Sequence, residues 1–156
     1  MKTLSKKAKY ALRALYVLTR QYGQGPVLIS ILSEQEAIPK KFLEAILLEM
    51  RNRGLVSSKK GKGGGYALAK DPSTIKIGDV VRIIDGPLAP LPCASETAYR
   101  QCDECPDVSI CETRMVMREV RDATAAILDT ITLEEICRRI DAKKQAQESE
   151  SLMYYI

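Results

Sequence analysis

The chain has 156 residues, of which 46% are hydrophobic and 28% charged, so it is long enough for one domain with a substantial core. It contains five cysteines and no histidine. The absence of histidine excludes a Ser-His-Asp triad, a Cys-His dyad and any metal site with an imidazole ligand, and we expect no enzyme. No apolar run approaches 18 residues and no signal peptide is recognised, so we expect a cytoplasmic protein without a membrane segment, whose thiols stay reduced.

The net charge of +4 is unevenly distributed along the chain. Residues 1–70 hold 14 Lys and Arg against 4 Asp and Glu, whereas residues 71–156 hold 10 against 16. The first half therefore carries a charge of +10 and the second a charge of −6. This asymmetry indicates that the first half binds a polyanion and that the second has a different task.

The first half is predicted to consist of short helices followed by a hairpin. Apolar residues at helical spacing predict helices at 4–22, 29–36 and 39–53. Pro39 favours a tight turn before the third of these, and Gly54 ends it. The period then changes, which predicts two short strands at 55–58 and 66–69. Two helices around a tight turn, followed by a hairpin, are typical of a winged helix-turn-helix.

The segment between the two predicted strands, residues 59–65, is called the wing tip here. It carries three lysines and four glycines, so its backbone can approach a nucleic acid closely. A Walker-type phosphate loop is excluded, because Gly65 leads into Tyr66 rather than into Lys-Ser/Thr before a helix. We interpret the wing tip as a contact to DNA phosphates or to a minor groove.

The predicted helix at 39–53 is the candidate recognition helix. Its first turns should offer polar groups to base edges in the major groove, while Phe42, Leu43 and Ile46 are expected to face inward. Lys2, Lys6 and Lys7 are expected to add phosphate contacts. The residues proposed to bind DNA are Lys9, Lys40, Lys41, Glu44, Lys59, Lys60, Lys62, Gly63, Gly64 and Gly65.

The second half is predicted to be helical on both sides of a long irregular segment. A helix is expected at 77–84, and residues 85–113 show no period; this segment is called the cysteine loop. A long helix follows at 113–128. Thr132 to Glu135 matches a capping box and is expected to start a further helix through Ile140, after which the chain is polar.

Four cysteines lie within 19 residues of the cysteine loop, at Cys93, Cys102, Cys105 and Cys111. Cys137 stands apart on a predicted helix and is expected to be a buried apolar residue. The spacing of the four leaves three chemistries open: an iron–sulfur cluster, a structural zinc site and a disulfide switch. The cluster is the leading hypothesis, because the site must use thiolates and only one pair has the Cys-x-x-Cys spacing that zinc prefers.

Several segments resemble bacterial winged-helix regulators of the IscR, NsrR and CymR kind, over residues 4 to about 139. The resemblance rests on Leu4-Ser-x-Lys-x-x-Tyr-Ala-Leu-Arg-Ala14, Phe42-Leu-Glu44, Gly54-Leu-Val-x-Ser58, Gly63-Gly-Gly-Tyr-x-Leu68, Ile77-Gly-Asp-Val80, Cys111-x-Thr-Arg114, the helix from Met115 to Val120, and Leu133-x-x-Ile136. It implies a homodimer that packs through the long helix after the last loop cysteine and binds a pseudo-palindrome in double-stranded DNA.

The resemblance also implies an iron–sulfur cluster, of 2Fe-2S or 4Fe-4S type, with Cys93, Cys105 and Cys111 at the positions of the family's cluster cysteines. Glu44 matches an acidic residue that helps to discriminate DNA sites. Two positions depart from the family: Arg114 stands where IscR-type proteins have a histidine ligand, and Lys9 stands where NsrR-type proteins have an aspartate.

Because the chain lacks both of those ligands, we infer that Cys102 is the fourth ligand. The alternatives are Asp103, Glu104 and Glu112. An all-thiolate site would lie at a lower reduction potential than a site with a neutral imidazole.

These interpretations give one fold and one leading function. The fold is expected to be mainly α with a small β-hairpin: a winged helix-turn-helix plus a long C-terminal dimerisation helix. The expected parts are a DNA-binding domain at 1–84, a sensor loop at 85–113, a dimerisation helix and following helix at 114–142, and a flexible tail at 143–156. The expected function is a repressor controlled by a cluster. The alternatives are control by thiol oxidation or zinc, or CymR-like control by a protein partner.

Overall fold

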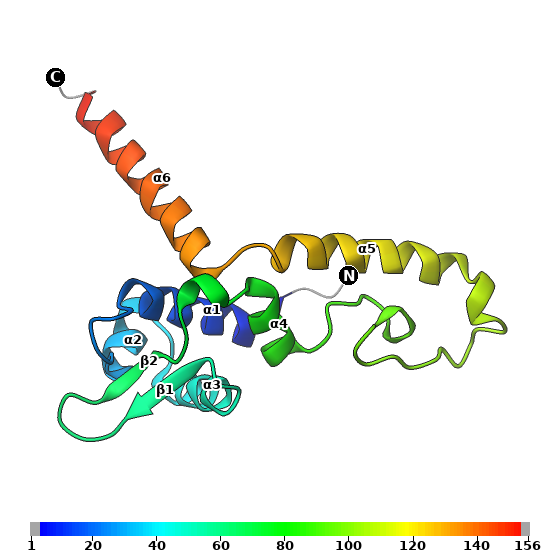
Figure 1. The fold of residues 1–156 in the computed structure, drawn as a ribbon, viewed down its shortest axis with the longest axis horizontal. Coiled ribbons are helices and arrows are strands. Elements are labelled where there is room, and N and C mark those ends of the chain that lie inside the picture. The colour runs from blue at the N-terminus through cyan, green and yellow to red at the C-terminus, as the bar shows by residue number, and fades with distance from the viewer. Residues whose placement is uncertain (1–3, 154–156) are drawn as a thin grey trace.

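The computed structural model describes residues 4–153 (Figure 1). Its helices are α1 (Lys6–Arg20), α2 (Ile29–Glu36), α3 (Lys40–Asn52), α4 (Ile77–Asp85), α5 (Glu112–Leu128) and α6 (Leu133–Met153). The strands are β1 (Val56–Lys59) and β2 (Gly65–Leu68), and single 3₁₀ turns are η1 (Pro72–Thr74), η2 (Pro92–Ala94) and η3 (Val108–Ile110). This composition confirms the predicted fold class, which is mainly helical with one small hairpin.

Helix α1 forms the centre of the aliphatic core. The Ser5 hydroxyl caps its first turn by accepting a hydrogen bond from the Ala8 backbone N–H at 3.0 Å. One side of α1 is fully buried, and its alanines let the neighbouring helices α3, α4 and α6 approach closely. Leu15 and Leu18 fill the space between them, together with Leu32 of α2 and Ile46 of α3.

Helices α2 and α3 form the predicted helix-turn-helix. Ala37 takes a left-handed conformation, with φ of +48°, and ends α2; Pro39 then precedes α3. The Ser33 hydroxyl donates a hydrogen bond of 2.6 Å to the Ile38 carbonyl, and the Ile38 side chain is buried. The turn is therefore fixed by a hydrogen bond on one side and by core packing on the other.

The hairpin follows α3 with the predicted order of strands. Strands β1 and β2 pair antiparallel, with Val56 opposite Leu68 and Lys59 opposite Gly65. Tyr66 of β2 also exchanges two backbone hydrogen bonds of 2.8 Å with Val27, just before α2. The hairpin is thus attached to the helix-turn-helix at both of its edges, which makes the arrangement a winged helix.

Most of the cysteine loop lacks regular structure, as predicted, apart from the 3₁₀ turns η2 and η3. Helix α5 begins at Glu112, directly after Cys111, and α6 begins at Leu133. The Thr132 side chain accepts a hydrogen bond from the Glu135 backbone N–H at 3.1 Å, which confirms the predicted helix start at this capping box.

The expected end of the last helix at Ile140 and the flexible tail at 143–156 need correction. Helix α6 continues to Met153, and residues 154–156 lie outside the described residues. Residues 143–153 contain no glycine or proline and are mostly Lys, Gln, Ala and Glu, which favour a helix even without tertiary packing. The side chains of this stretch are exposed, so local propensity accounts for the extra turns.

The two halves of the chain are joined by backbone pairing and one ion pair. The Leu133 N–H donates to the Ile75 carbonyl at 2.9 Å, and the Arg82 guanidinium forms two hydrogen bonds of 2.7 and 2.8 Å with the Asp129 carboxylate. Gly78 makes this contact feasible, because a Cβ atom there would lie 2.0 Å from an Asp129 carboxylate oxygen. The C-terminal end of α5 is therefore fixed to α4.

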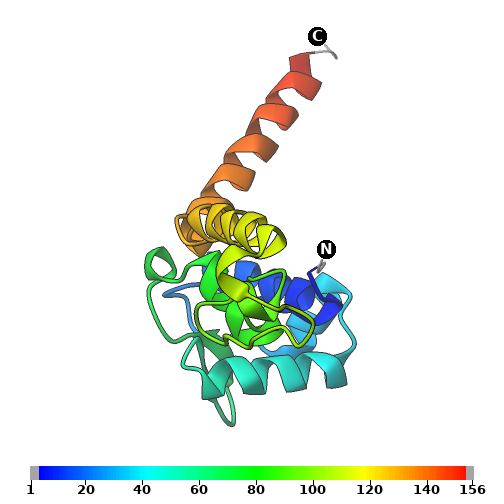
Figure 2. The same cartoon turned by 90° about the vertical axis from the view of Figure 1, so that its right-hand side faces the viewer.

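Two views show how these elements are distributed. Helix α3 and the hairpin lie on the same side of the molecule in Figures 1 and 2, while the cysteine loop lies at the far end of α5. Helix α6 extends away from both. Among the helices of residues 4–153, none combines the length and the apolar character needed to cross a bilayer.

Candidate DNA-binding surface and cysteine loop

The recognition helix is α3, and its polar first turns are accessible. Leu43, Ile46, Leu47 and Met50 are buried and fix the inner face of the helix. Lys40, Lys41 and Glu44 are exposed, as predicted for groups that contact base edges. The exposed side also carries Leu48, whose side chain is 46% exposed.

Phe42 does not face inward as predicted. Its side chain is 43% exposed, and its ring packs edge-on against Tyr10 of α1, with the ring centroids 5.7 Å apart. The Tyr10 ring also lies 5.6 Å from the Lys6 ammonium and 5.8 Å from the Arg13 guanidinium. The aromatic pair thus joins α1 to the recognition helix at the surface, because the buried positions of α3 are already occupied by aliphatic side chains.

The wing tip has the backbone geometry that its glycines predict. Gly65 has φ of +139°, and a Cβ atom there would lie 2.3 Å from the Val27 carbonyl oxygen. A Cβ atom on Gly64 would lie 2.3 Å from the Lys59 carbonyl oxygen, while Gly63 has φ of +71° and open space around it. Lys59, Lys60 and Lys62 are all exposed, so the wing tip presents three cations on a tightly turned backbone.

The lysines of α1 differ in their surroundings. Lys9 is exposed and remains a candidate DNA contact. Lys7 forms an ion pair with Glu49 of α3, and Lys6 lies over the Tyr10 ring, so both already contact protein groups. Lys2 lies outside the described residues.

The cysteine loop brings its four cysteines around one hollow. Cys93, Cys102, Cys105 and Cys111 all line a depression of about 470 Å³, next to the first turn of α5. Cys93 is buried, Cys102 is exposed, and Cys105 and Cys111 are half-buried; all four are free thiols. Cys137 is buried on α6, and its thiol donates to the Tyr16 carbonyl at 3.8 Å, which confirms its separation from the loop.

Two of the loop thiols lie within hydrogen-bonding distance of each other. Burial raises the pKa of the Cys105 thiol above its ordinary value, and its hydrogen bond with Cys111 raises this pKa further. Cys111 caps α5: its sulfur accepts a hydrogen bond from the Arg114 backbone N–H at 3.4 Å. The positive end of the helix dipole therefore points at this sulfur and favours an anion there.

The loop residues fit a thiolate-bound group in chemistry and in shared location, although the site is not pre-assembled. Among the described residues, no three Cys, Asp or Glu side chains converge closely enough to hold one metal ion. Glu104 and Glu112 line the same hollow and stay alternatives for the fourth ligand, whereas Asp103 is not among its lining residues. The ligand set therefore stays a prediction, and the loop would have to contract around a bound group.

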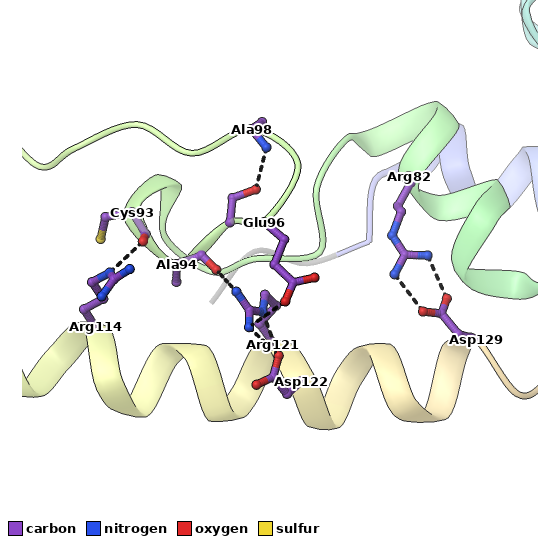
Figure 3. Close-up of polar contacts among 10 residues, drawn as sticks. Arg82, Cys93, Ala94, Glu96, Ala98, Arg114, Arg121, Asp122 and Asp129 are labelled. Carbon is purple, nitrogen blue, oxygen red and sulfur yellow. Dashed lines mark hydrogen bonds and ion pairs between the residues drawn. The ribbon is translucent and has the colours of Figure 1, made fainter.

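Two arginines on α5 hold the first loop cysteine, and sequence reasoning missed their role (Figure 3). Arg114 Nε donates to the Cys93 carbonyl at 2.9 Å, and Arg121 Nη1 donates to the Ala94 carbonyl at 2.5 Å. Arg121 is only 8% exposed. The signal that could have revealed them is their spacing of seven residues, which puts two cations on one face of a helix.

The sequence of residues 4–139 matches the Rrf2 family, described as iron-dependent transcriptional regulators. An rrf2-like HTH-type transcriptional regulator of Rhodobacter capsulatus is 42% identical over 136 residues, which cover 85% of this chain and 91% of that protein. CymR of Bacillus subtilis is 31% identical over 98% of this chain and 99% of its own length.

Solved structures agree with the sequence comparisons. The structure of B. subtilis CymR, the global cysteine regulator, superposes with a TM-score of 0.73 at 30% identity and covers 89% of this chain and 98% of that one. IscR of T. potens superposes with a TM-score of 0.71 at 27% identity and covers 89% and 88% of the two chains. Together with the winged helix and its accessible recognition helix, these matches show that the chain is a transcriptional regulator of the Rrf2 family.

Proposed function

We propose that this regulator is a homodimeric repressor whose affinity for its operator is controlled by an iron–sulfur cluster bound in the cysteine loop. The proposed ligands are Cys93, Cys102, Cys105 and Cys111. The observation that carries the proposal is that all four line one hollow as free thiols, although they are spread over 19 residues of irregular chain.

The surroundings of the hollow suit a cluster. Four thiolates give such a group a net negative charge, and both the N-terminus of α5 and the Arg114 guanidinium border the hollow. When bound, the cluster would supply a redox-active centre sensitive to iron supply and oxidants. Because the pKa of Cys105 is raised, binding must release a proton from this thiol, so assembly should become easier as the pH rises.

The exposed surface of α5 supports a homodimer. Met115, Val116 and Ile127 are 61%, 48% and 60% exposed, and the single buried side chain of the helix is that of Arg121. An apolar helix face of this kind in a regulator is best covered by a second copy of the same helix. Two winged domains related by a two-fold axis would then bind a pseudo-palindromic site in double-stranded DNA.

The proposal is tested by comparing the DNA affinity of the cluster-loaded and metal-free forms. An operator would first be isolated by selection from random duplexes, and fluorescence anisotropy would then measure the Kd of both forms under anaerobic conditions. We expect the two Kd values to differ by at least about tenfold, since allosteric couplings are typically 1–3 kcal/mol. Equal Kd values, or failure to bind any duplex, would contradict the proposal.

A second candidate function is a thiol switch. The hydrogen bond between Cys105 and Cys111 places these thiols close enough to favour a disulfide between them, and the relative CymR is described as a cysteine regulator. In this case diamide would change DNA affinity of the metal-free protein, and Cys111→Ser would abolish the change while Cys102→Ser would not. Zinc, or a protein partner as proposed for a CymR-like protein, would instead leave the protein colourless.

A further inference from the structure

We propose that Arg114 and Arg121 are positioning residues that hold Cys93 against helix α5. This inference rests on the proposed function only in the use to which the positioned thiol is put. The hydrogen bonds themselves are present in the metal-free chain, so the role of the arginines can be tested without a cluster.

The two arginines bind consecutive carbonyl groups of the same turn. Arg114 donates to the Cys93 carbonyl and Arg121 to the Ala94 carbonyl, from positions two helical turns apart on α5 (Figure 3). Both carbonyls belong to η2, which spans Pro92–Ala94. Two charge-assisted hydrogen bonds to adjacent carbonyls fix both the position and the rotation of the turn, and therefore the direction of the Cys93 side chain.

The Arg121 cation is compensated on both sides. Its Nη2 atom lies 3.2 Å from Glu96 and 2.5 Å from Asp122, while its side chain is 9% exposed. Glu96 belongs to the cysteine loop, so the ion pair attaches a second point of the loop to α5. Burying an arginine is favourable only when its charge and its donors are satisfied in this way, and here every partner belongs to the loop or to α5.

Arg114 connects the first loop cysteine to the last. Its side chain binds the Cys93 carbonyl, its backbone N–H donates to the Cys111 sulfur, and its guanidinium lies 6.0 Å from the Tyr99 ring. An arginine cannot ligate a metal through its cationic guanidinium. The residue at the position of a family histidine ligand therefore acts in this chain on the carbonyl of one cysteine and on the sulfur of another.

Site-resolved alkylation of the metal-free, reduced protein tests this role. N-ethylmaleimide would be added for increasing times and each cysteine followed by peptide mass spectrometry. The variants are Arg114→Met and Arg121→Met, which keep the length of the side chain but remove its donors. Arg118→Met is the matched control, because Arg118 is an exposed residue of the same helix with no hydrogen bond or ion pair within residues 4–153.

Cys93 and Cys137 are both buried, so Cys137 reports general unfolding. We expect alkylation of Cys93 to become roughly 10- to 100-fold faster in both variants, because opening of the turn no longer breaks a charge-assisted hydrogen bond. The rates of Cys137, and of both residues in Arg118→Met, should match those of the wild type. An unchanged Cys93 rate, or equal acceleration of Cys137, would overturn the proposal.

A measurement on the loaded protein separates this inference from the proposed cluster. Wild type and Arg114→Met would be reconstituted with iron and sulfide, and the loss of visible absorbance followed after adding a chelator. We expect about tenfold faster loss in Arg114→Met than in Arg118→Met, because Cys93 is no longer held. A wild type that takes up no cluster, combined with selective acceleration of Cys93, would contradict the proposed function and support the positioning role.

Discussion

The wing tip and the cysteine loop are both irregular segments, but different forces hold them. The wing tip is shaped by its own backbone, through Gly63, Gly64 and Gly65 and the strand pairing on either side. The cysteine loop is instead held by side chains that come from 21 and 27 residues away, those of Arg114 and Arg121. A locally shaped segment can present a constant surface to DNA, whereas a segment tied to a distant helix can transmit its own state to that helix.

Substitution of a wing glycine should produce the largest effect on stability. Gly65→Ala adds a Cβ atom 2.3 Å from the Val27 carbonyl oxygen at a φ of +139°, so we expect a loss of about 3 kcal/mol in the free energy of unfolding. Gly63→Ala is the control, with φ of +71° and open space, and should cost only about 1 kcal/mol. Urea denaturation measures both, and equal losses would mean that the wing is not shaped by close backbone approach.

The recognition helix and the wing tip should differ in what their contacts contribute. Lys41→Ala or Glu44→Ala is expected to change the preference among DNA sites by about 1–3 kcal/mol, because these side chains face base edges. Lys60→Ala should weaken binding to all duplexes alike and lower the slope of log Kd against log salt concentration by about 1. Anisotropy titrations with several duplexes would measure both effects, and a sequence-selective loss in Lys60→Ala would contradict the wing assignment.

The junction between the two halves should contribute a smaller, pH-dependent term. Hydrogen bonds from Arg82 lower the pKa of Asp129 below its ordinary value of 3.8. The unfolded chain therefore takes up a proton on this carboxyl more readily, so the stabilisation is present above about pH 4 and is lost as the pH falls through the lower pKa of the folded state. The pair is one-third exposed, which limits its contribution to about 1 kcal/mol.

Thermal denaturation of Asp129→Asn checks this contribution. The variant should be less stable than the wild type at pH 7, and the difference should disappear at low pH, once the wild-type carboxyl is protonated. Asp79→Asn is the control, because Asp79 lies 3.9 Å from the same guanidinium and is more exposed. A difference between Asp129→Asn and the wild type that is independent of pH would show that the effect comes from packing rather than from charge.

Local patterns predicted most of the fold. The helix at 29–36, the turn before Pro39 and the glycine-rich hairpin each depend on neighbours within a few residues, and each is present in the structure. Phe42 was misplaced because its environment depends on Tyr10, which is 32 positions earlier in the chain. The end of α6 was misplaced because the absence of apolar residues was interpreted as disorder, although the residues themselves favour a helix.

The candidate site was predictable in composition but not in arrangement. The clustering of Cys93, Cys102, Cys105 and Cys111 predicted that they act together, and they do line one hollow. The contacts of Arg114 and Arg121 with the loop could not be predicted, because the path of a loop without a period is set by long-range hydrogen bonds. The same two contacts distinguish this region from the wing tip.

The central claim is that the four loop cysteines bind an iron–sulfur cluster, and the iron and sulfide content of anaerobically purified protein tests it most directly. We predict a coloured wild type containing iron and acid-labile sulfide in equal amounts. Cys102→Ser should lose most of the colour and Cys137→Ser should keep it, because only Cys102 lines the hollow. A colourless wild type with zinc or without metal, or equal losses in the two variants, would contradict the account.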